Sequence, residues 1–205
     1  MAVAVEQQPL RKMSESFKGL ADNIGAVRSD LELAPFSQAC SHVSPLFRCL
    51  GIAFKFAELD YVAKVDDLLE TSKSIVTVHV MMDQDIQANS VRRAGSHTRN
   101  LLRVKRGLDM VKVLFEQILA TESNSLKDPA STAYTHVFAP FHGWAIRKAV
   151  AAGMYALPTK AQLLMKLNED ESSARTYMQN YIASSALVIS YIDQLFTSKE
   201  LGIDW

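Results

Sequence analysis

Helical periodicity is the feature of this chain that most constrains its fold. Around residue 108, apolar side chains recur at the spacing of one helix face, namely Leu101, Val104, Leu108, Val111 and Phe115. Comparable patterns cover most of the 205 residues, and only 8 glycines and 6 prolines interrupt them. Because 48% of the residues are hydrophobic and no stretch shows a convincing strand pattern, the sequence predicts an all-α fold.

The periodic stretches predict roughly seven or eight helices. No internal repeat, low-complexity tract or long linker divides the chain, so we expect one domain over residues 1–205. Residues 30–36 and 123–129 are predicted to form loops or short turns. The predicted helices cover residues 9–24, 37–69 with a break near Pro45 or Gly51, 72–88, 96–122, 140–156, 159–167 and 170–198.

The charges of the chain balance, because 22 Lys and Arg residues are matched by 22 Asp and Glu residues. A net charge of zero argues against nucleic-acid binding, which usually needs a basic surface. Cys40 and Cys49 lack the spacing of a disulfide framework and are interpreted as reduced core thiols. No run approaches the roughly 18 apolar residues of a membrane span. We therefore expect a cytoplasmic protein that associates with membranes only peripherally.

Three arginines occupy a stripe that would ordinarily be apolar. Arg99, Arg103 and Arg106 are spaced i, i+4 and i+7 and so share one helix face. Further along, the same face continues into Met110 and Val113. Arginine favours phosphate because its planar fork donates several hydrogen bonds and keeps its charge. The stripe therefore suits a ligand with an anionic head and an oily body, and a solvated helix face is the alternative.

A second polar cluster follows another apolar stripe. Asp60 and Lys64 are four residues apart on a helix and can form a local ion pair. The functional alternative is a clamp in which Asp60 accepts a hydrogen bond from a ligand and Lys64 meets an anion. The stripe that leads to this pair consists of Leu46, Cys49, Ala53 and Ala57.

His142 and Trp144 lie close together in the expected first turn of the helix over 140–156. A lone histidine is more often a satisfied structural group than a ligand contact. Trp144 is either a core residue or an amphipathic surface anchor. These two residues are therefore weaker site candidates than the cationic stripe.

Signals of catalysis are scarce. There is no glycine-rich phosphate loop, no GxSxG elbow and no HExxH motif, and we expect no cofactor. A catalytic triad assembled from residues that are distant in the sequence stays an open alternative. No acidic residues combine at metal-ligand spacing with four histidines of the chain, namely His79, His97, His136 and His142.

Several motifs of this chain resemble those of the glycolipid transfer protein superfamily, most closely plant members of its ceramide-1-phosphate branch. The resemblance covers nearly the whole chain. It implies an all-α, two-layer helical sandwich of about eight helices that carries one sphingolipid, and a link to programmed cell death. The motifs are SPLF at 44–47, FAELDYVAKVDD at 56–67, GSHTRNLLRVKRGL at 95–108, HGWAIRK at 142–148, GMYALP at 153–158 and LGIDW at 201–205.

The resemblance assigns roles to individual residues. Asp60 matches the acid that accepts the ceramide amide N–H, and His142 matches the histidine that meets the amide carbonyl. Lys64 replaces an Asn of glycolipid-binding members, and Arg103 replaces a Trp that stacks on the sugar. Both changes exchange sugar recognition for positive charge, as expected for a phosphate head group.

The remaining roles also follow from the resemblance. Arg99 and Arg106 would complete the phosphate cradle, and Trp144 matches a tryptophan associated with membrane docking. Strict up-and-down alternation of helices would place Asp60 and Arg99 at opposite ends of the molecule. Their convergence is therefore implied by the family fold and not by the periodicity.

These observations favour a non-enzymatic protein that transfers ceramide-1-phosphate, phytoceramide-1-phosphate or related lipids between membranes. Hydrating two lipid chains of about 25 methylenes costs roughly 20 kcal/mol, which only an apolar pocket offsets. A lipid sensor that regulates protein partners, as in cell-death signalling, and a helical hydrolase using His142 and Asp60 are the alternatives. Four basic residues are candidates for docking on anionic membranes, or else a solvated face: Arg92, Arg93, Arg147 and Lys148.

Overall fold

The computed structural model describes residues 8–27 and 30–205 and is built from helices. The all-α prediction is confirmed. Extended pairing within the described residues amounts to two isolated bridges, Glu32–Thr77 and Ser125–Thr159. The α-helices are α1 Pro9–Val27, α2 Leu33–Ser41, α3 Ser44–Cys49, α4 Lys55–Thr71, α5 Val78–Gln87, α6 His97–Leu119, α7 Lys127–Val137, α8 Trp144–Gly153, α9 Lys160–Leu167 and α10 Glu171–Ser198. Three short 3-10 turns join them: η1 Ile52–Phe54, η2 Ala139–Phe141 and η3 Met154–Ala156.

Two segments predicted as loops are helical in their second parts, at 33–36 and 127–129. The loop predicted over 30–36 ends early because α2 begins at Leu33, with Pro35 in its first turn, where the missing N–H costs no hydrogen bond. Helix α7 was missed altogether, since Pro129 was interpreted as loop and the buried stripe of this helix uses small residues such as Ala130 and Ala133. The predicted breaks at Pro45 and Gly51 both occur, so the stripe leading to Asp60 is divided among α3, η1 and α4.

Two predicted helices are shorter than expected. The helix over 72–88 begins only at Val78, where the Thr77 hydroxyl accepts a hydrogen bond from the Val80 N–H at 3.2 Å. The helix over 140–156 is interrupted, because His142 is extended (φ −106°, ψ 135°) and Gly143 precedes α8. His142 is therefore not in the first turn of a helix, which corrects the prediction.

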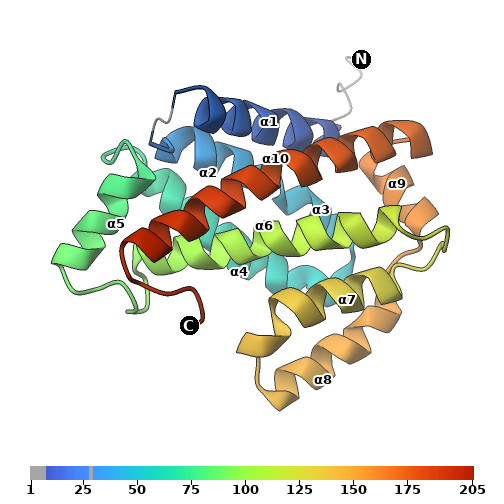
Figure 1. The fold of residues 1–205 in the computed structure, drawn as a ribbon. Coiled ribbons are helices and arrows are strands. Elements are labelled where there is room, and N and C mark those ends of the chain that lie inside the picture. Colours follow the sequence, from blue (N-terminus) through green and yellow to red (C-terminus); the bar gives the residue numbers. More distant parts are fainter. Residues whose placement is uncertain (1–7, 28–29) are drawn as a thin grey trace, which may run out of the picture.

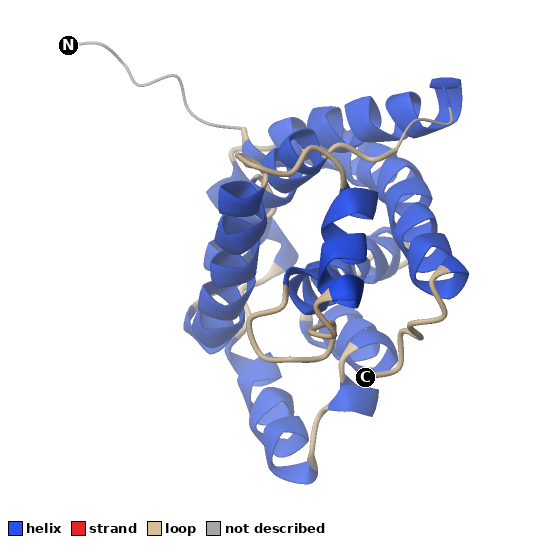
Figure 2. Ribbon diagram, turned by 90° about the vertical axis from the view of Figure 1, so that its left-hand side faces the viewer, coloured by secondary structure: helices blue, strands red, loops and turns tan. Residues whose placement is uncertain are grey.

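The helices form two layers, as predicted. Helices α1 and α10 pack along each other, and in Figure 1 α10 crosses in front of α6, with α4 behind α6. Helix α6 contacts α10 on one side and α4 and α7 on the others, so it lies at the centre of the molecule. Helices α7 and α8 form one end, at the lower right of Figure 1, and the chain after α10 turns back toward α6. Figure 2 shows the same helices and loops from the side.

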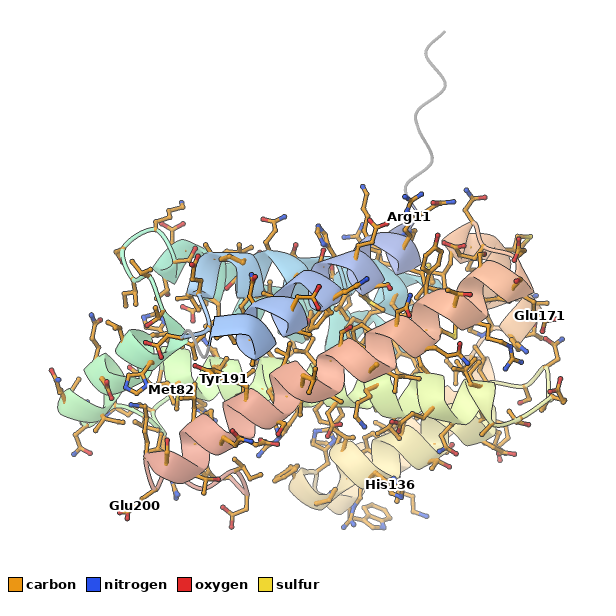
Figure 3. All side chains as sticks on the ribbon, turned by 45° about the horizontal axis from the view of Figure 1, so that its top comes forward. Arg11, Met82, His136, Glu171, Tyr191 and Glu200 are labelled. Carbon is orange, nitrogen blue, oxygen red and sulfur yellow. The ribbon has the colours of Figure 1, made fainter. Side chains whose placement is uncertain are left out.

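The core lies between the two layers. The Tyr181 ring of α10 meets Phe17 of α1 at 5.0 Å and Phe115 of α6 at 5.6 Å between centroids, both edge to face. The Tyr181 hydroxyl donates to the Leu108 carbonyl at 3.2 Å, so this buried polar group is satisfied. The charged side chain of Arg11, on α1, lies at the surface instead (Figure 3).

Helices α4 and α6 run antiparallel and approach each other closely. Asp67, late in α4, lies 2.9 Å from the His97 ring nitrogen and 2.8 Å from the Asn100 amide nitrogen, both early in α6. Tyr61, early in α4, faces Gly107, where an added Cβ would lie 2.7 Å from the tyrosine ring. The glycine therefore permits the contact between the two helices at this level.

This direction places the Asp60–Lys64 end of α4 beside the middle of α6. Strict up-and-down alternation is wrong here, because the six residues before Val78 lie outside any helix and α5 is short. The N-terminus of α6 is fixed by a side-chain cap: the Ser96 hydroxyl accepts a hydrogen bond from the Arg99 N–H at 3.2 Å.

Candidate functional site

Asp60 and Lys64 form the predicted ion pair on α4. The Lys64 ammonium group donates to the Asp60 carboxylate and, at 3.1 Å, to the Asp60 main-chain oxygen. The side chain of Lys64 is only 14% exposed, whereas that of Asp60 is 69% exposed. The carboxylate therefore keeps acceptor capacity toward solvent or a ligand.

The arginine stripe lies on α6 as predicted, and its three members differ. Arg99 and Arg103 are half-buried. Among the described residues, neither side chain forms an ion pair or a hydrogen bond, so both guanidinium groups keep all their donors available. Their apolar continuation is confirmed by Met110, which is buried, and by Val113, which packs on the core.

Arg106 is almost completely buried, with 5% of its surface exposed. Its Nη2 donates to the main-chain oxygens of Ile203 and Trp205, each at 2.7 Å. Its guanidinium carbon lies 3.6 Å from the centre of the Phe141 ring. Burial, followed by repulsion from Arg103, lowers its pKa to about 10, so Arg106 stays charged at neutral pH.

His142 is held by aromatic side chains at the end of α7. The Tyr134 hydroxyl lies 2.9 Å from the His142 Nδ1, and the Phe138 ring stacks on the imidazole at 5.7 Å. Burial lowers the pKa of His142, Arg103 and Arg106 lower it further, and Asp60 opposes them. The imidazole is consequently neutral at pH 7, and its Nε2 has no hydrogen-bond partner among the described residues.

Charged residues of α4 and α6 lie close enough to His142 to influence its pKa. Asp60, Arg103 and Arg106 all act on His142, and Arg103 also acts on Arg106. Lys64 joins this group through its ion pair with Asp60. Arg99 continues the stripe one turn beyond Arg103, toward the start of α6, and lies at the edge of the group.

Large apolar side chains remain uncovered near this cluster. Trp144, the first residue of α8, is 70% exposed, and its ring lies 6.0 Å from the Lys148 ammonium nitrogen. None of the residues of α8 is buried. Uncovered apolar surfaces of this kind are common in the binding and membrane-contact regions of proteins. The exposed apolar residues of η1, α4, η2, α8 and η3 are Ile52, Phe56, Leu59, Phe141, Trp144, Ile146 and Tyr155.

Sequence reasoning missed the residues that hold the site in shape. Tyr134 and Phe138 position His142, but both belong to the region of the unpredicted helix α7. The sequence did contain a signal for the start of α7, because Asp128 and Pro129 are favourable in the first turn of a helix. Residues 201–205 also contact the site, through main-chain oxygens bound to Arg106.

Other features of the described chain lie apart from this cluster. Two surface hollows, of about 510 and 320 Å³, are lined by none of the seven candidate residues. Within residues 8–27 and 30–205, no group of three His, Cys, Asp or Glu side chains is placed to hold a metal ion. No helix of that part combines the length and apolar character needed to cross a bilayer.

A cationic stripe, a neighbouring acid and histidine, and uncovered apolar side chains on a two-layer helical fold define a binding protein for an amphipathic ligand with an anionic head. The glycolipid transfer protein model matches residues 31–169, and the chain belongs to this family.

Individual relatives agree with the family assignment. The chain is 65% identical over 206 residues to the Arabidopsis thaliana protein Accelerated cell death 11, with 100% of both chains covered. It is similar to the crystal structure of the D60N mutant of that protein complexed with C12 ceramide-1-phosphate, with a TM-score of 0.96 and coverage of 98% and 100%. Human ceramide-1-phosphate transfer protein shares the fold at 20% identity, with a TM-score of 0.80 and coverage of 94% and 97%.

Proposed function

We propose that this protein transfers ceramide-1-phosphate and related phosphosphingolipids between membranes, one lipid at a time, without catalysing a reaction. The observation that carries the proposal is the cationic stripe of Arg99 and Arg103, which has no ion-pair partner among the described residues, beside Lys64 and Asp60 in a member of this family. The 65% identity to a protein whose D60N mutant is complexed with ceramide-1-phosphate supports this choice of ligand.

The phosphate would bind in a cradle of Lys64, Arg99 and Arg103. The positive charges of the three side chains repel one another, and a bound phosphate dianion offsets that repulsion. Each charge-assisted hydrogen bond contributes about 1.5–3 kcal/mol. Arg106 adds positive charge at the inner end of the cradle, although its Nη2 is already bonded to main-chain oxygens.

The ceramide amide would bind between Asp60 and His142. A Tyr134 hydroxyl that donates to Nδ1 of neutral His142 leaves the Nε2–H free to donate to the amide carbonyl. The exposed carboxylate of Asp60 accepts the amide N–H. The complex of the D60N mutant of the Arabidopsis relative with ceramide-1-phosphate indicates that, in that protein, the lipid can bind without this carboxylate.

The lipid chains require an apolar lining that keeps them from water. Hydration of two chains with about 25 methylenes costs roughly 20 kcal/mol. Uncovered side chains adjoin both halves of the amide site: Phe56 and Leu59 precede Asp60, and Phe141 and Trp144 flank His142. Chains entering between α4 and α8 would cover this surface.

Delivery to membranes would use the exposed face of α8. Trp144 is suited to the interface because its ring is amphipathic, and Arg147 and Lys148 beside it are attracted to anionic lipids. The protein would thus act in the cytoplasm and associate with membranes peripherally. The name of the Arabidopsis relative supports a role in programmed cell death.

A vesicle-to-vesicle fluorescence assay tests this function. Labelled ceramide-1-phosphate is expected to move from donor to acceptor vesicles faster with catalytic amounts of protein, whereas unphosphorylated ceramide is expected to move little. Tight binding without transfer would instead indicate a lipid sensor, and release of a hydrolysed product would indicate an enzyme. Either result would contradict the proposal.

A further inference from the structure

One buried guanidinium group joins three segments that are far apart in the sequence. Arg106 of α6 donates twice to the C-terminal residues, at the main-chain oxygens of Ile203 and Trp205. Its opposite side stacks on Phe141 of η2 at 3.6 Å. Because Phe141 directly precedes His142, the position of Arg106 is coupled to that of the imidazole.

Residues 201–205, here called the strap, have a defined conformation of their own. The Trp205 indole N–H donates to the main-chain oxygens of Leu201 at 3.0 Å and Gly202 at 3.1 Å. Gly202 adopts φ +68°, which favours glycine, and so permits the turn. The Trp205 ring lies 6.4 Å from that of Phe196 and 5.1 Å from the Arg92 guanidinium carbon. In Figure 1 the strap runs from the end of α10 back beneath it.

Within the described residues, the strap supplies the only hydrogen-bond acceptors of Arg106. A buried charge is stable only when hydrogen bonds replace the water it has lost. The strap provides two main-chain oxygens, and Asp204 adds a favourable charge at longer range. If the strap moved away, the guanidinium of Arg106 would be left unpaired and would turn toward solvent, away from Phe141.

We propose that the strap is a positioning element of the lipid site: by fixing Arg106 against Phe141, it holds His142 beside Arg103 and Asp60. Its effect on lipid binding rests on the proposed function, since it presupposes that His142 contacts the ceramide amide. Trp205 and Gly202 are then positioning residues that touch no lipid themselves.

A matched set of variants separates this role from a general loss of structure. Trp205→Ala removes the indole hydrogen bonds that close the strap. Gly202→Ala strains the left-handed turn and places a Cβ 3.1 Å from an Asp204 carboxylate oxygen, without touching the core. Ile203→Ala is the control, because it removes a partly exposed side chain but keeps the main-chain oxygen that Arg106 uses.

The first measurement is the His142 pKa by NMR in lipid-free protein. The charged and titratable groups that face or act on the ring are Asp60 of α4, Arg103 and Arg106 of α6, and Tyr134 of α7. Loosening the strap moves Arg106 away and exposes the imidazole, so the pKa is expected to rise in Trp205→Ala and Gly202→Ala. It should stay unchanged in Ile203→Ala. An unchanged pKa in both strap variants would overturn the proposal.

The second measurement is ceramide-1-phosphate transfer by the same variants. We expect a roughly tenfold loss in Trp205→Ala and Gly202→Ala, comparable to the loss of one charge-assisted hydrogen bond, and none in Ile203→Ala. A raised His142 pKa with undiminished transfer would overturn the role of the strap in the lipid site. Failure of the wild-type protein to transfer the lipid would instead refute the proposed function, because the pKa measurement needs no lipid.

Discussion

Replacing Arg103 with alanine is expected to separate lipid transfer from folding stability. The Arg103 guanidinium forms no ion pair or hydrogen bond with described residues, so its donors are available to the lipid phosphate. One charge-assisted hydrogen bond is worth about 1.5–3 kcal/mol. Its loss corresponds to a roughly 10- to 150-fold weaker affinity for ceramide-1-phosphate.

The same substitution should not destabilise the lipid-free protein. Arg103 lowers the pKa of both Arg106 and His142, which means that its charge disfavours their protonated forms. Removing this charge relieves repulsion without leaving a buried partner unsatisfied. The thermal unfolding temperature of Arg103→Ala is therefore expected to equal or slightly exceed that of the wild type.

Vesicle transfer of labelled ceramide-1-phosphate and thermal unfolding of the same preparations measure the two effects. Arg11→Ala is a control of equal charge change, because Arg11 is an exposed residue of α1 paired only with Glu15 (Figure 3). It should transfer the lipid as the wild type does. Undiminished transfer by Arg103→Ala would refute the phosphate cradle, and a large drop in unfolding temperature would refute the reasoning about repulsion.

Two histidines have pKa values below the ordinary range. Burial lowers the pKa of His142, and the charges of Arg103 and Arg106 lower it further. Burial also lowers the pKa of His42, and the charge of Lys12 adds to this effect. The stability that depends on their neutral forms is present above their unfolded pKa, near 6.5, and is lost as the pH falls toward the lower folded values. Calorimetry should show a lower unfolding temperature at pH 5.5 than at pH 7.5, and an equal or higher one would contradict this. Gly107→Ala forces a Cβ to 2.7 Å from the Tyr61 ring and should reduce the free energy of unfolding by roughly 1–3 kcal/mol in urea titrations, unlike Gly19→Ala, where nothing lies within 4 Å. Trp144→Ala should slow transfer while changing stability by less than about 0.5 kcal/mol, because the ring is 70% exposed; normal vesicle binding by this variant would argue against a docking role.

Helix periodicity predicted the parts of this fold that apolar side chains on one helix face determine. The apolar face of α6 is buried from Leu101 to Phe115, as expected from the sequence. Helix α7 escaped prediction because alanines occupy much of its buried face, and small residues give a weak periodic signal. The break at His142 was also missed; the extended residue lies 2.9 Å from the Tyr134 hydroxyl, a contact between side chains that helical periodicity does not encode.

The proposed cradle could be predicted in part because two of its residues share one helix face. Arg99 and Arg103 needed only the spacing of α6, whereas the position of Asp60 and Lys64 beside the middle of α6 depends on the antiparallel packing of α4, which local periodicity does not encode. The burial and hydrogen bonding of Arg106 could not be predicted for another reason. Its partners are main-chain oxygens of Ile203 and Trp205, which every residue type possesses and which therefore leave no pattern in a sequence.

The exposure of helix α8 implies that it can unfold locally, independently of the central helices. Because it buries none of its residues, it contributes little to the cooperative unit formed by α1, α4, α6 and α10. Its amide hydrogens should therefore exchange with deuterated solvent well before those of the central helices, at a free energy far below that of global unfolding. The part of the chain that carries Trp144 is thus free to yield while the rest of the scaffold stays intact.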